Sequence, residues 1–312
     1  MNKSLKAGNS TAEGIAILAI IAVIMLATFK GTPNSTAKPS NTSDSATGNT
    51  SSKTENLAVN NSSYAKSISL NTGNARSAYQ PYEEYISIYN KSREPISITN
   101  WQLKNSKSKR AYDFGGTLRY FPSDIAIIGQ AALFISPNSL NTLQNIVLKP
   151  GETAVITTGS VGSQSPYKIV SFKENICSGY LEDLPEYTFT PSLTRNCPRP
   201  ANESGVNNLD TECRKFIERL ASCYTPKFNT LDKDGGICSN CVDDKPLSSS
   251  CVAFIKNRFN YGSCIAYHVG DKDFADRTWR IFLGKGWEMW ANKYETVSLL
   301  DQFGRLVVEK TY

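Results

Sequence analysis

The sequence predicts a mainly β protein, built as an antiparallel β-sandwich that carries a disulfide-rich, partly helical insertion. Two observations favour this fold: short runs of alternating apolar residues recur from residue 64 to the end, and all eight cysteines fall in the middle of that region. An apolar segment and a stretch rich in serine, threonine and asparagine come before it. We expect an N-terminal signal or transmembrane helix at 1–30, a disordered stalk at 31–63, and the folded part at 64–312 with the insertion at about 172–269.

Composition argues against several classes of protein. The 34 basic and 28 acidic residues leave a net charge of +6, well short of the basicity of a dedicated nucleic-acid binder. The single histidine, His268, argues against histidine triads and histidine-rich metal centres. Eight cysteines beyond an apolar segment indicate an oxidising compartment. We therefore expect a binding or structural protein rather than an enzyme, with no catalytic residue, cofactor or metal.

Residues 14–29 are almost wholly apolar and form a candidate membrane helix. About 20 apolar residues cross a bilayer, so this run needs snorkelling of Lys30 to span one. Lys3 and Lys6 precede the run, and the positive-inside rule then places the N-terminus in the cytoplasm and the main domain outside, as a single-pass protein of the cell membrane. The alternative is a cleaved signal peptide, which the lack of an Ala-x-Ala site after the run disfavours.

A glutamate, Glu13, stands five residues after Gly8 and directly before the apolar run. This arrangement resembles the class III signal of type IV pilins. The resemblance implies cleavage after Gly8, a new N-terminus at Asn9, and pairing of Glu13 with the terminal amine of a neighbouring subunit in a homo-oligomeric filament. The other interpretation of Glu13 is an interfacial charge at the edge of a membrane helix.

The predicted stalk, 31–63, contains no aromatic residue and has no hydrophobic period, so it cannot bury enough surface to offset the entropy of ordering. It is also rich in sites for N-glycosylation, which depends on whether the organism has the machinery. The candidate acceptors, two of them in the folded part, are Asn34, Asn41, Asn49, Asn60, Asn61, Asn90 and Asn202.

The folded part contains many short strand-like runs separated by turn residues, a pattern typical of a sandwich of immunoglobulin type. We expect the closing hairpin to complete the same sandwich as the first strands, because an isolated hairpin is marginal in water. Its inward residues would be Val297, Leu299, Leu306 and Val308. The predicted strands are 65–70, 84–89, 95–103, 132–135, 146–148, 154–158, 279–283, 296–300 and 305–310.

Several of these runs also resemble a known family. Residues 84–92 and 95–103 look like the opening of a lamin-tail domain, 148–152 like the turn before one of its strands, and 295–308 like its last hairpin. The resemblance covers about residues 65–312. It implies an immunoglobulin-like β-sandwich, whose members serve in nuclear lamins and, in prokaryotes, as modules of cell-surface and secreted proteins.

The insertion departs from the compact lamin form and resembles the elaborated prokaryotic members in two cysteine motifs. These are Asn175-Ile176-Cys177-Ser178-Gly179-Tyr180 and Asn196-Cys197-Pro198.

Helical periodicity predicts helices at 210–224, capped by Asp210, and at 248–259, capped by Ser248. Eight cysteines allow 105 connectivities, and two antiparallel helices with a cysteine near each end suggest one of them. The hypothesis pairs Cys213 with Cys264, Cys223 with Cys251 and Cys177 with Cys197, which leaves Cys238 and Cys241.

Cys238-x-x-Cys241 has two further interpretations beside a structural disulfide. A redox motif usually opens a helix, and here loop residues flank the pair. A zinc site would need two more cysteines from the helices.

Other candidate sites are weaker. The fragments 232–235 and 271–273 resemble parts of calcium loops, but they lack the ligand set of an EF-hand and are more typical of turns. His268 lies in an apolar run and is expected to be a packing residue. Trp279, Trp287 and Trp290 form either a platform on which a carbohydrate stacks or part of the core.

One stretch is rich in basic residues and contains a single acidic residue, Glu94. It is a candidate contact for a polyanion, such as a cell-wall polymer or extracellular DNA, through salt-sensitive interactions; the alternative is a solvated loop. Its residues are Lys91, Arg93, Lys104, Lys107, Lys109 and Arg110.

Three functions fit these observations. The first is a membrane-anchored surface protein that presents a binding or structural domain to an unknown surface or protein ligand, in adhesion or envelope organisation. The second is a pilin-like filament subunit that displays the sandwich. The third is an accessory module for extracellular nucleic-acid or polysaccharide binding.

Overall fold

The computed structural model describes residues 61–120, 122–228, 230–231, 236–238, 240–242 and 245–312. The apolar segment, the pilin-like residues Gly8, Asn9 and Glu13, and almost all of the expected stalk lie outside these residues. In the part of the chain that the structure describes, no helix is long and apolar enough to cross a membrane. The anchor and the stalk therefore stay predictions from the sequence.

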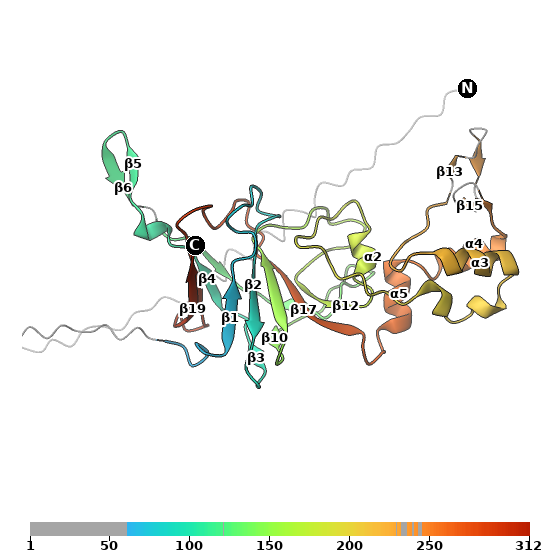
Figure 1. Ribbon diagram of the computed structural model, residues 1–312, viewed down its shortest axis with the longest axis horizontal. Coiled ribbons are helices and arrows are strands. Elements are labelled where there is room, and N and C mark those ends of the chain that lie inside the picture. The colour runs from blue at the N-terminus through green and yellow to red at the C-terminus, as the bar shows by residue number, and fades with distance from the viewer. Residues whose placement is uncertain (1–60, 121, 229, 232–235, 239, 243–244) are drawn as a thin grey trace, which may run out of the picture. The chain divides into compact units, whose positions relative to one another are not determined.

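Two β-sheets enclose one apolar core (Figure 1). Within the described ranges, the larger sheet has the order β1–β2–β11–β17–β12–β8–β9 and the smaller has the order β19–β18–β4–β7. The strands of the larger sheet are β1 (Ile68–Asn71), β2 (Tyr85–Asn90), β8 (Ala131–Ala132), β9 (Leu143–Gln144), β11 (Thr153–Thr157), β12 (Phe172–Asn175) and β17 (Ala275–Phe282). Those of the smaller sheet are β4 (Gln102–Lys104), β7 (Ile125–Ile127), β18 (Thr296–Leu300) and β19 (Leu306–Thr311).

Short strand pairs and helices make up the remaining regular structure. The pairs are β3 (Ile96–Ser97) with β10 (Val147–Leu148), β5 (Tyr112–Phe114) with β6 (Thr117–Arg119), β13 (Thr230–Leu231) with β14 (Ile237–Cys238), and β15 (Cys241–Val242) with β16 (Lys245–Pro246). The helices are α2 (Gly179–Glu182), α3 (Thr211–Arg219), α4 (Ser249–Lys256) and α5 (Tyr261–His268), with 3₁₀ turns η1 (Lys107–Lys109), η2 (Pro200–Asn202) and η3 (Val206–Asn208).

The alternating pattern of β2 explains its place in the sandwich. Ile86 and Ile88 are fully buried, while Tyr85, Ser87 and Tyr89 between and beside them are not. Because successive side chains of a strand point to opposite faces, this alternation gives the larger sheet one apolar inner face. The prediction of a mainly β sandwich is confirmed.

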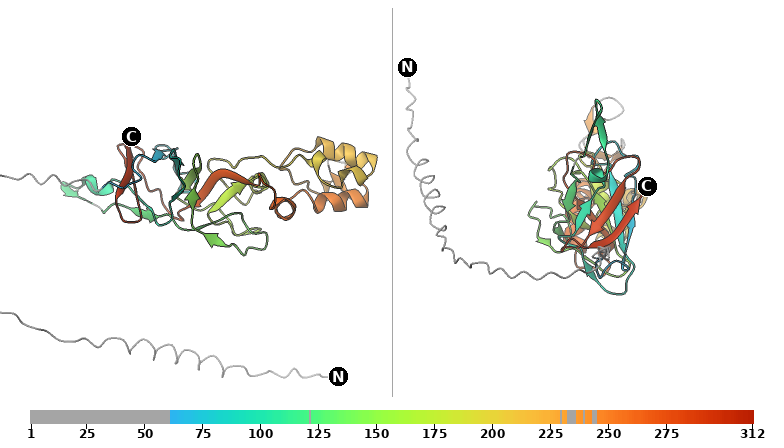
Figure 2. Two further views of the ribbon diagram at one scale, coloured as in Figure 1. Left: turned by 90° about the horizontal axis from the view of Figure 1, so that it is seen from below. Right: turned by 90° about the vertical axis from the view of Figure 1, so that its left-hand side faces the viewer.

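The closing hairpin completes the smaller sheet. β18 pairs antiparallel with β4, so that Leu299 stands opposite Leu103, and β19 lies next to β1 (Figures 1 and 2). The expectation that the end of the chain joins the first strands is confirmed, but one detail of it is wrong. Val307, which the alternation does not predict, is buried at a register shift after Leu299, whereas Leu306 is only half-buried. Val308 stands opposite Leu299 and packs, half-buried, against the sandwich core as expected.

β12 is buried along its whole length. Its Phe172 belongs to the insertion core, and the neighbouring β17 contributes Trp279 and Ile281 to the sandwich core. The two charged side chains of β12 each have an opposite charge at 2.5 Å: Lys173 contacts Glu152, and Glu174 contacts Arg280. Pairing of this kind is what allows ions to stay buried. β12 is thus the strand at which the sandwich and the insertion meet.

The insertion has apolar cores of its own and, in the described residues, four helices, α2 to α5. α3 and α4 begin where the sequence predicts, because Asp210 accepts a hydrogen bond from the Cys213 N–H at 2.9 Å and Ser248 accepts one from the Cys251 N–H at 3.3 Å. α3 ends earlier than expected, at Arg219. The sequence analysis missed α5, whose cap is Asn260.

Candidate functional site

All eight cysteines form disulfides, and all four bonds lie in the insertion. The expected disulfide framework is confirmed, and Cys238 pairs with Cys241 in a disulfide. The other bonds are Cys177–Cys264, Cys197–Cys223 and Cys213–Cys251.

The hypothesis for these three pairs is wrong. It assumed that the first cysteine of one helix meets the last of an antiparallel partner. Instead, the N-terminal ends of α3 and α4 meet: Ser248, the cap of α4, donates a hydrogen bond to the Asp210 carboxylate at 2.7 Å. Cys213 and Cys251 each occupy the first turn of their helix and therefore pair with each other.

The motif from Asn175 to Tyr180 builds a tight turn at the end of β12. The Asn175 side chain accepts a hydrogen bond from the Cys177 N–H at 3.0 Å, and the Ser178 hydroxyl accepts one from the Asn175 N–H at 2.9 Å. A Cβ atom on Gly179 would come within 2.2 Å of the Cys223 sulfur, so only glycine fits there. The turn thus lets two disulfides pack closely together.

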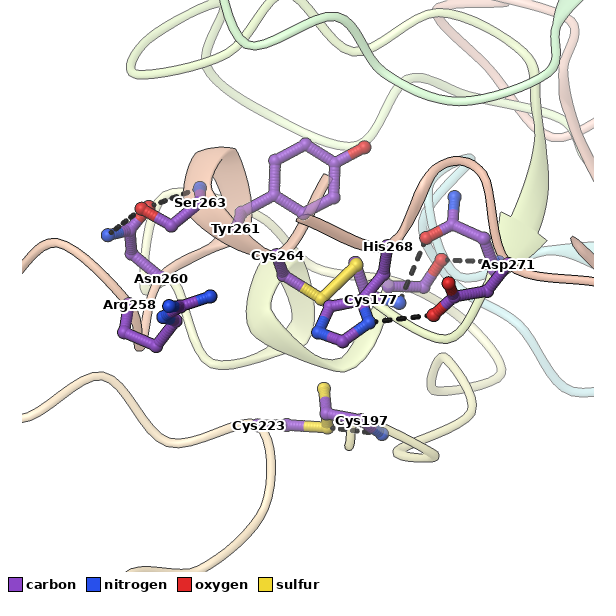
Figure 3. Close-up of a disulfide and its surroundings, with 12 residues drawn as sticks. Cys177, Cys197, Cys223, Arg258, Asn260, Tyr261, Ser263, Cys264, His268 and Asp271 are labelled. Atoms are coloured by element: carbon purple, nitrogen blue, oxygen red, sulfur yellow. Dashed lines mark hydrogen bonds and ion pairs between the residues drawn. A yellow bond between two sulfur atoms is a disulfide. The ribbon is translucent and has the colours of Figure 1, made fainter. Parts of the chain in front are cut away.

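His268 lies at the end of α5, near the Cys177–Cys264 disulfide (Figure 3). Its Nδ1 is 2.8 Å from Asp271 and its Nε2 is 2.9 Å from Glu203. Burial alone would lower the pKa of His268, but the hydrogen bonds and charges of Asp271 and Glu203 outweigh it and raise the pKa. The expected packing role is therefore wrong, because the ring bridges two carboxylates and thereby joins α5 to the segment after η2.

Of the two calcium-like fragments, 271–273 forms a bend and turn, as expected, with its first aspartate bound to His268. The fragment 232–235 lies outside the described residues.

One expected glycosylation site is wrong. Asn90 is fully buried, and its amide donates hydrogen bonds to the carbonyl oxygens of Glu94 and Leu148, both at 2.8 Å. An amide so engaged cannot accept a glycan. Asn61 and Asn202 are exposed, and the other candidate acceptors lie outside the described residues.

The basic stretch does not form one surface. Lys91 and Arg93 lie between β2 and β3, whereas Lys107 and Lys109 belong to η1, at the base of the β5–β6 hairpin on a different side of the sheets (Figure 1). The other two also lie away from the first pair: Lys104 is on β4, and Arg110 forms an ion pair with Glu295 at 3.6 Å. Strands separate residues that are close in the sequence, so a continuous polyanion surface is not supported.

The three tryptophans also separate. Trp279 and Trp290 are buried, at 3% and 2% exposure, and belong to the sandwich core. Trp287 is 56% exposed and lines a hollow of about 460 Å³, together with Tyr79, which is 76% exposed. Of the two interpretations, the core is therefore right for Trp279 and Trp290, and a platform of three tryptophans is wrong. The other lining residues include Asn105, Lys107, Asp124, Glu288, Met289, Trp290, Asn292 and Glu295.

Polar contacts hold the exposed indole of Trp287. Its Nε1 donates a hydrogen bond to Asp124 at 2.6 Å, and Lys285 contacts the other oxygen of Asp124 at 3.0 Å. Burial alone would raise the pKa of Asp124, but the hydrogen bonds from Trp287 and Lys285 outweigh it and lower the pKa. Asp124 is thus a carboxylate that fixes the ring by its edge.

Three buried side chains from distant parts of the chain fix the backbone of the loop that carries Trp287. Glu84 accepts hydrogen bonds from the N–H groups of Met289 at 2.7 Å and Trp290 at 3.2 Å. Asn105 donates to the Met289 carbonyl oxygen at 2.7 Å, and Glu295 accepts from the Ala291 N–H at 3.1 Å. Burial raises the pKa of Glu84 despite these bonds. The sequence analysis missed these anchors, because no local pattern connects residues 84, 105 and 295.

Residues 44–183 match the family model of the lamin tail domain. This match supports the resemblance seen in the sequence and the immunoglobulin-like type of the sandwich. It ends within the insertion, and the structure adds strands β17, β18 and β19 from beyond it to the same two sheets. No curated protein matches the chain.

Proposed function

We propose that this chain is a membrane-anchored, extracytoplasmic surface protein whose lamin-tail-type sandwich acts as a non-enzymatic binding or structural module, in adhesion or envelope organisation. The observation that carries the proposal is the disulfide framework. All eight cysteines are paired, and disulfides persist mainly outside the reducing cytosol. The match to the lamin tail domain supports the binding or structural role, and the apolar segment at 14–29 supports the anchor.

Thiol labelling on intact cells tests the compartment. We expect a membrane-impermeant alkylating reagent to leave the native protein unlabelled and to modify it after an impermeant reductant is added. A cytoplasmic protein of known free cysteines is the control for cell integrity. Labelling without reductant, or only after lysis, would contradict an oxidised domain at the cell surface.

Deletion of residues 1–30 tests the anchor. The deleted protein, directed to the same compartment by a cleavable leader, is expected in the soluble fraction with its disulfides formed. If it still sediments with membranes, the apolar segment is not what holds it there.

A pilin-like filament subunit is the second candidate, favoured by the spacing of Gly8 and Glu13. Mass spectrometry of the native N-terminus separates the two functions. A mature chain that begins at Asn9 supports processing of the pilin type, and an intact Met1 excludes it.

A further inference from the structure

We propose that the hollow beside Trp287 binds a neutral saccharide unit, with the apolar face of the sugar ring stacked on the indole. The inference rests on the proposed function, since it names the ligand class of a displayed binding module. It follows from the exposure of the aromatic rings, the unengaged polar groups, the balance of charge and the rigidity of the loop.

The two exposed rings provide an apolar surface that folding leaves in water. Trp287 and Tyr79 are large aromatic side chains at 56% and 76% exposure, and both line the same hollow. The Trp287 N–H is already bonded to Asp124, and the Lys285 ammonium lies 5.4 Å from the centre of its ring. Because Lys285 lies over the ring, what the indole offers to a ligand is the opposite face, which suits the C–H groups on one side of a pyranose.

Polar groups without partners surround this surface. Within the described part of the chain, the Glu288 and Asn292 side chains have no hydrogen-bond partner, and the Trp290 Nε1 is buried without one. A buried donor without a partner destabilises the folded state, and a ligand oxygen that accepts from it would remove that cost. A carboxylate and an amide at the rim of an aromatic hollow can bond the hydroxyl groups of a sugar as acceptor and as donor.

The lining has three acidic residues and one basic residue, but two of the acidic ones are paired with cations just outside the hollow, so the charge around it is close to balanced. This balance favours an uncharged ligand. Asp124 is paired with Lys285 at 3.0 Å, and Glu295 with Arg110 at 3.6 Å. Glu288 and Lys107 contribute one charge of each sign. A strongly anionic or cationic ligand would meet no excess of opposite charge here.

The hollow also has the size and rigidity of a ligand site. Its volume of about 460 Å³ lies within the range of about 300–1,000 Å³ usual for small-molecule sites. Glu84, Asn105 and Glu295 hold the backbone of the loop before any ligand arrives. A preformed loop loses little entropy on binding, which matters for weak ligands such as sugars.

The test is a titration of the full-length, oxidised chain in a detergent without a sugar headgroup. The probes are cellobiose, N,N′-diacetylchitobiose and mannobiose. Isothermal calorimetry and saturation-transfer NMR measure their binding. We expect at least one to bind, and Trp287→Ala to weaken binding about fivefold or more, which corresponds to about 1 kcal/mol of lost aromatic stacking. The matched control is Phe303→Ala, which removes another ring of 72% exposure that does not line the hollow.

A second variant separates contact from folding. Glu288→Gln keeps the shape of the side chain and is expected to weaken binding while leaving the melting temperature unchanged. The inference is overturned if none of the three sugars binds, or if Trp287→Ala binds as tightly as the parent. It is also overturned if only dextran sulfate binds, in a salt-sensitive way.

Thiol labelling on intact cells distinguishes a failure of the sugar-binding inference from a failure of the proposed surface function. Normal surface labelling with no sugar binding overturns this inference alone, whereas cytoplasmic labelling overturns the proposed function.

Discussion

In the sandwich, strands far apart in the sequence bring Leu103, Leu299 and Ile88 into one apolar core, whereas in the insertion disulfides link chain segments around two separate clusters. The first arrangement depends on the burial of apolar surface, which is lost cooperatively. The second depends on covalent links that restrict the unfolded chain. One chain thus contains two kinds of stability, and they are expected to respond differently to truncation, reduction and pH.

Removal of residues 285–312 is expected to have the largest effect. It deletes β18 and β19 and with them the buried Val297, Leu299 and Val307. Each such side chain contributes about 1.5–3 kcal/mol, against a total of about 5–15 kcal/mol for a domain. We expect no cooperative melting transition of the sandwich by circular dichroism. A sharp transition at an unchanged temperature would show that the hairpin is peripheral.

The double change Cys177→Ser, Cys264→Ser is expected to come next. This disulfide closes 87 residues, and the chain-entropy argument gives a loss of about 4–5 kcal/mol. The matched control is Cys238→Ser, Cys241→Ser. The disulfide that it removes spans a sequence separation of only three residues, and its loss is expected to lower the free energy of unfolding by about 1.5 kcal/mol. Hydrogen exchange should show increased opening in the insertion and little change in β2 and β18; equal effects of both variants would refute the loop-length argument.

Asn90→Ala tests a buried hydrogen-bond group of the sandwich. It leaves the carbonyl oxygens of Glu94 and Leu148 without their donor, which is expected to cost about 1–3 kcal/mol in urea unfolding. Asn202→Ala, at an exposed position, should change stability by about 0.5 kcal/mol or less. Similar effects of the two changes would argue against the buried network, and a glycan on Asn90 in the native protein would contradict its burial.

The smallest expected effect is a dependence on pH in the insertion. Because the folded pKa of His268 lies above its ordinary value, its contribution to stability is complete below about pH 6.5 and is lost as the pH rises through the raised pKa. Hydrogen exchange of α5, compared at pH 6 and pH 9 after correction for the intrinsic rate, should show weaker protection at the higher pH. His268→Gln should remove most of this difference. The groups that face the ring are Glu203 and Asp271, with Arg258 3.6 Å from Glu203. A pH response that persists unchanged in His268→Gln would assign it to another group.

Patterns that depend on near neighbours in the chain could be predicted from the sequence alone. The alternation of Ile86 and Ile88 predicts a half-buried strand, and Asp210 and Ser248 predict the starts of two helices. Eight cysteines predict a disulfide framework. In each case the physical cause acts within a few residues or through composition.

Only the tertiary structure decided which distant groups meet. It paired Cys213 with Cys251 because two helix N-termini are adjacent, and it buried Val307 at a register shift between β18 and β19. It also left Trp287 exposed while Trp290, three residues later, entered the core. These outcomes depend on contacts between residues far apart in the chain, and no local pattern of residue types contains that information.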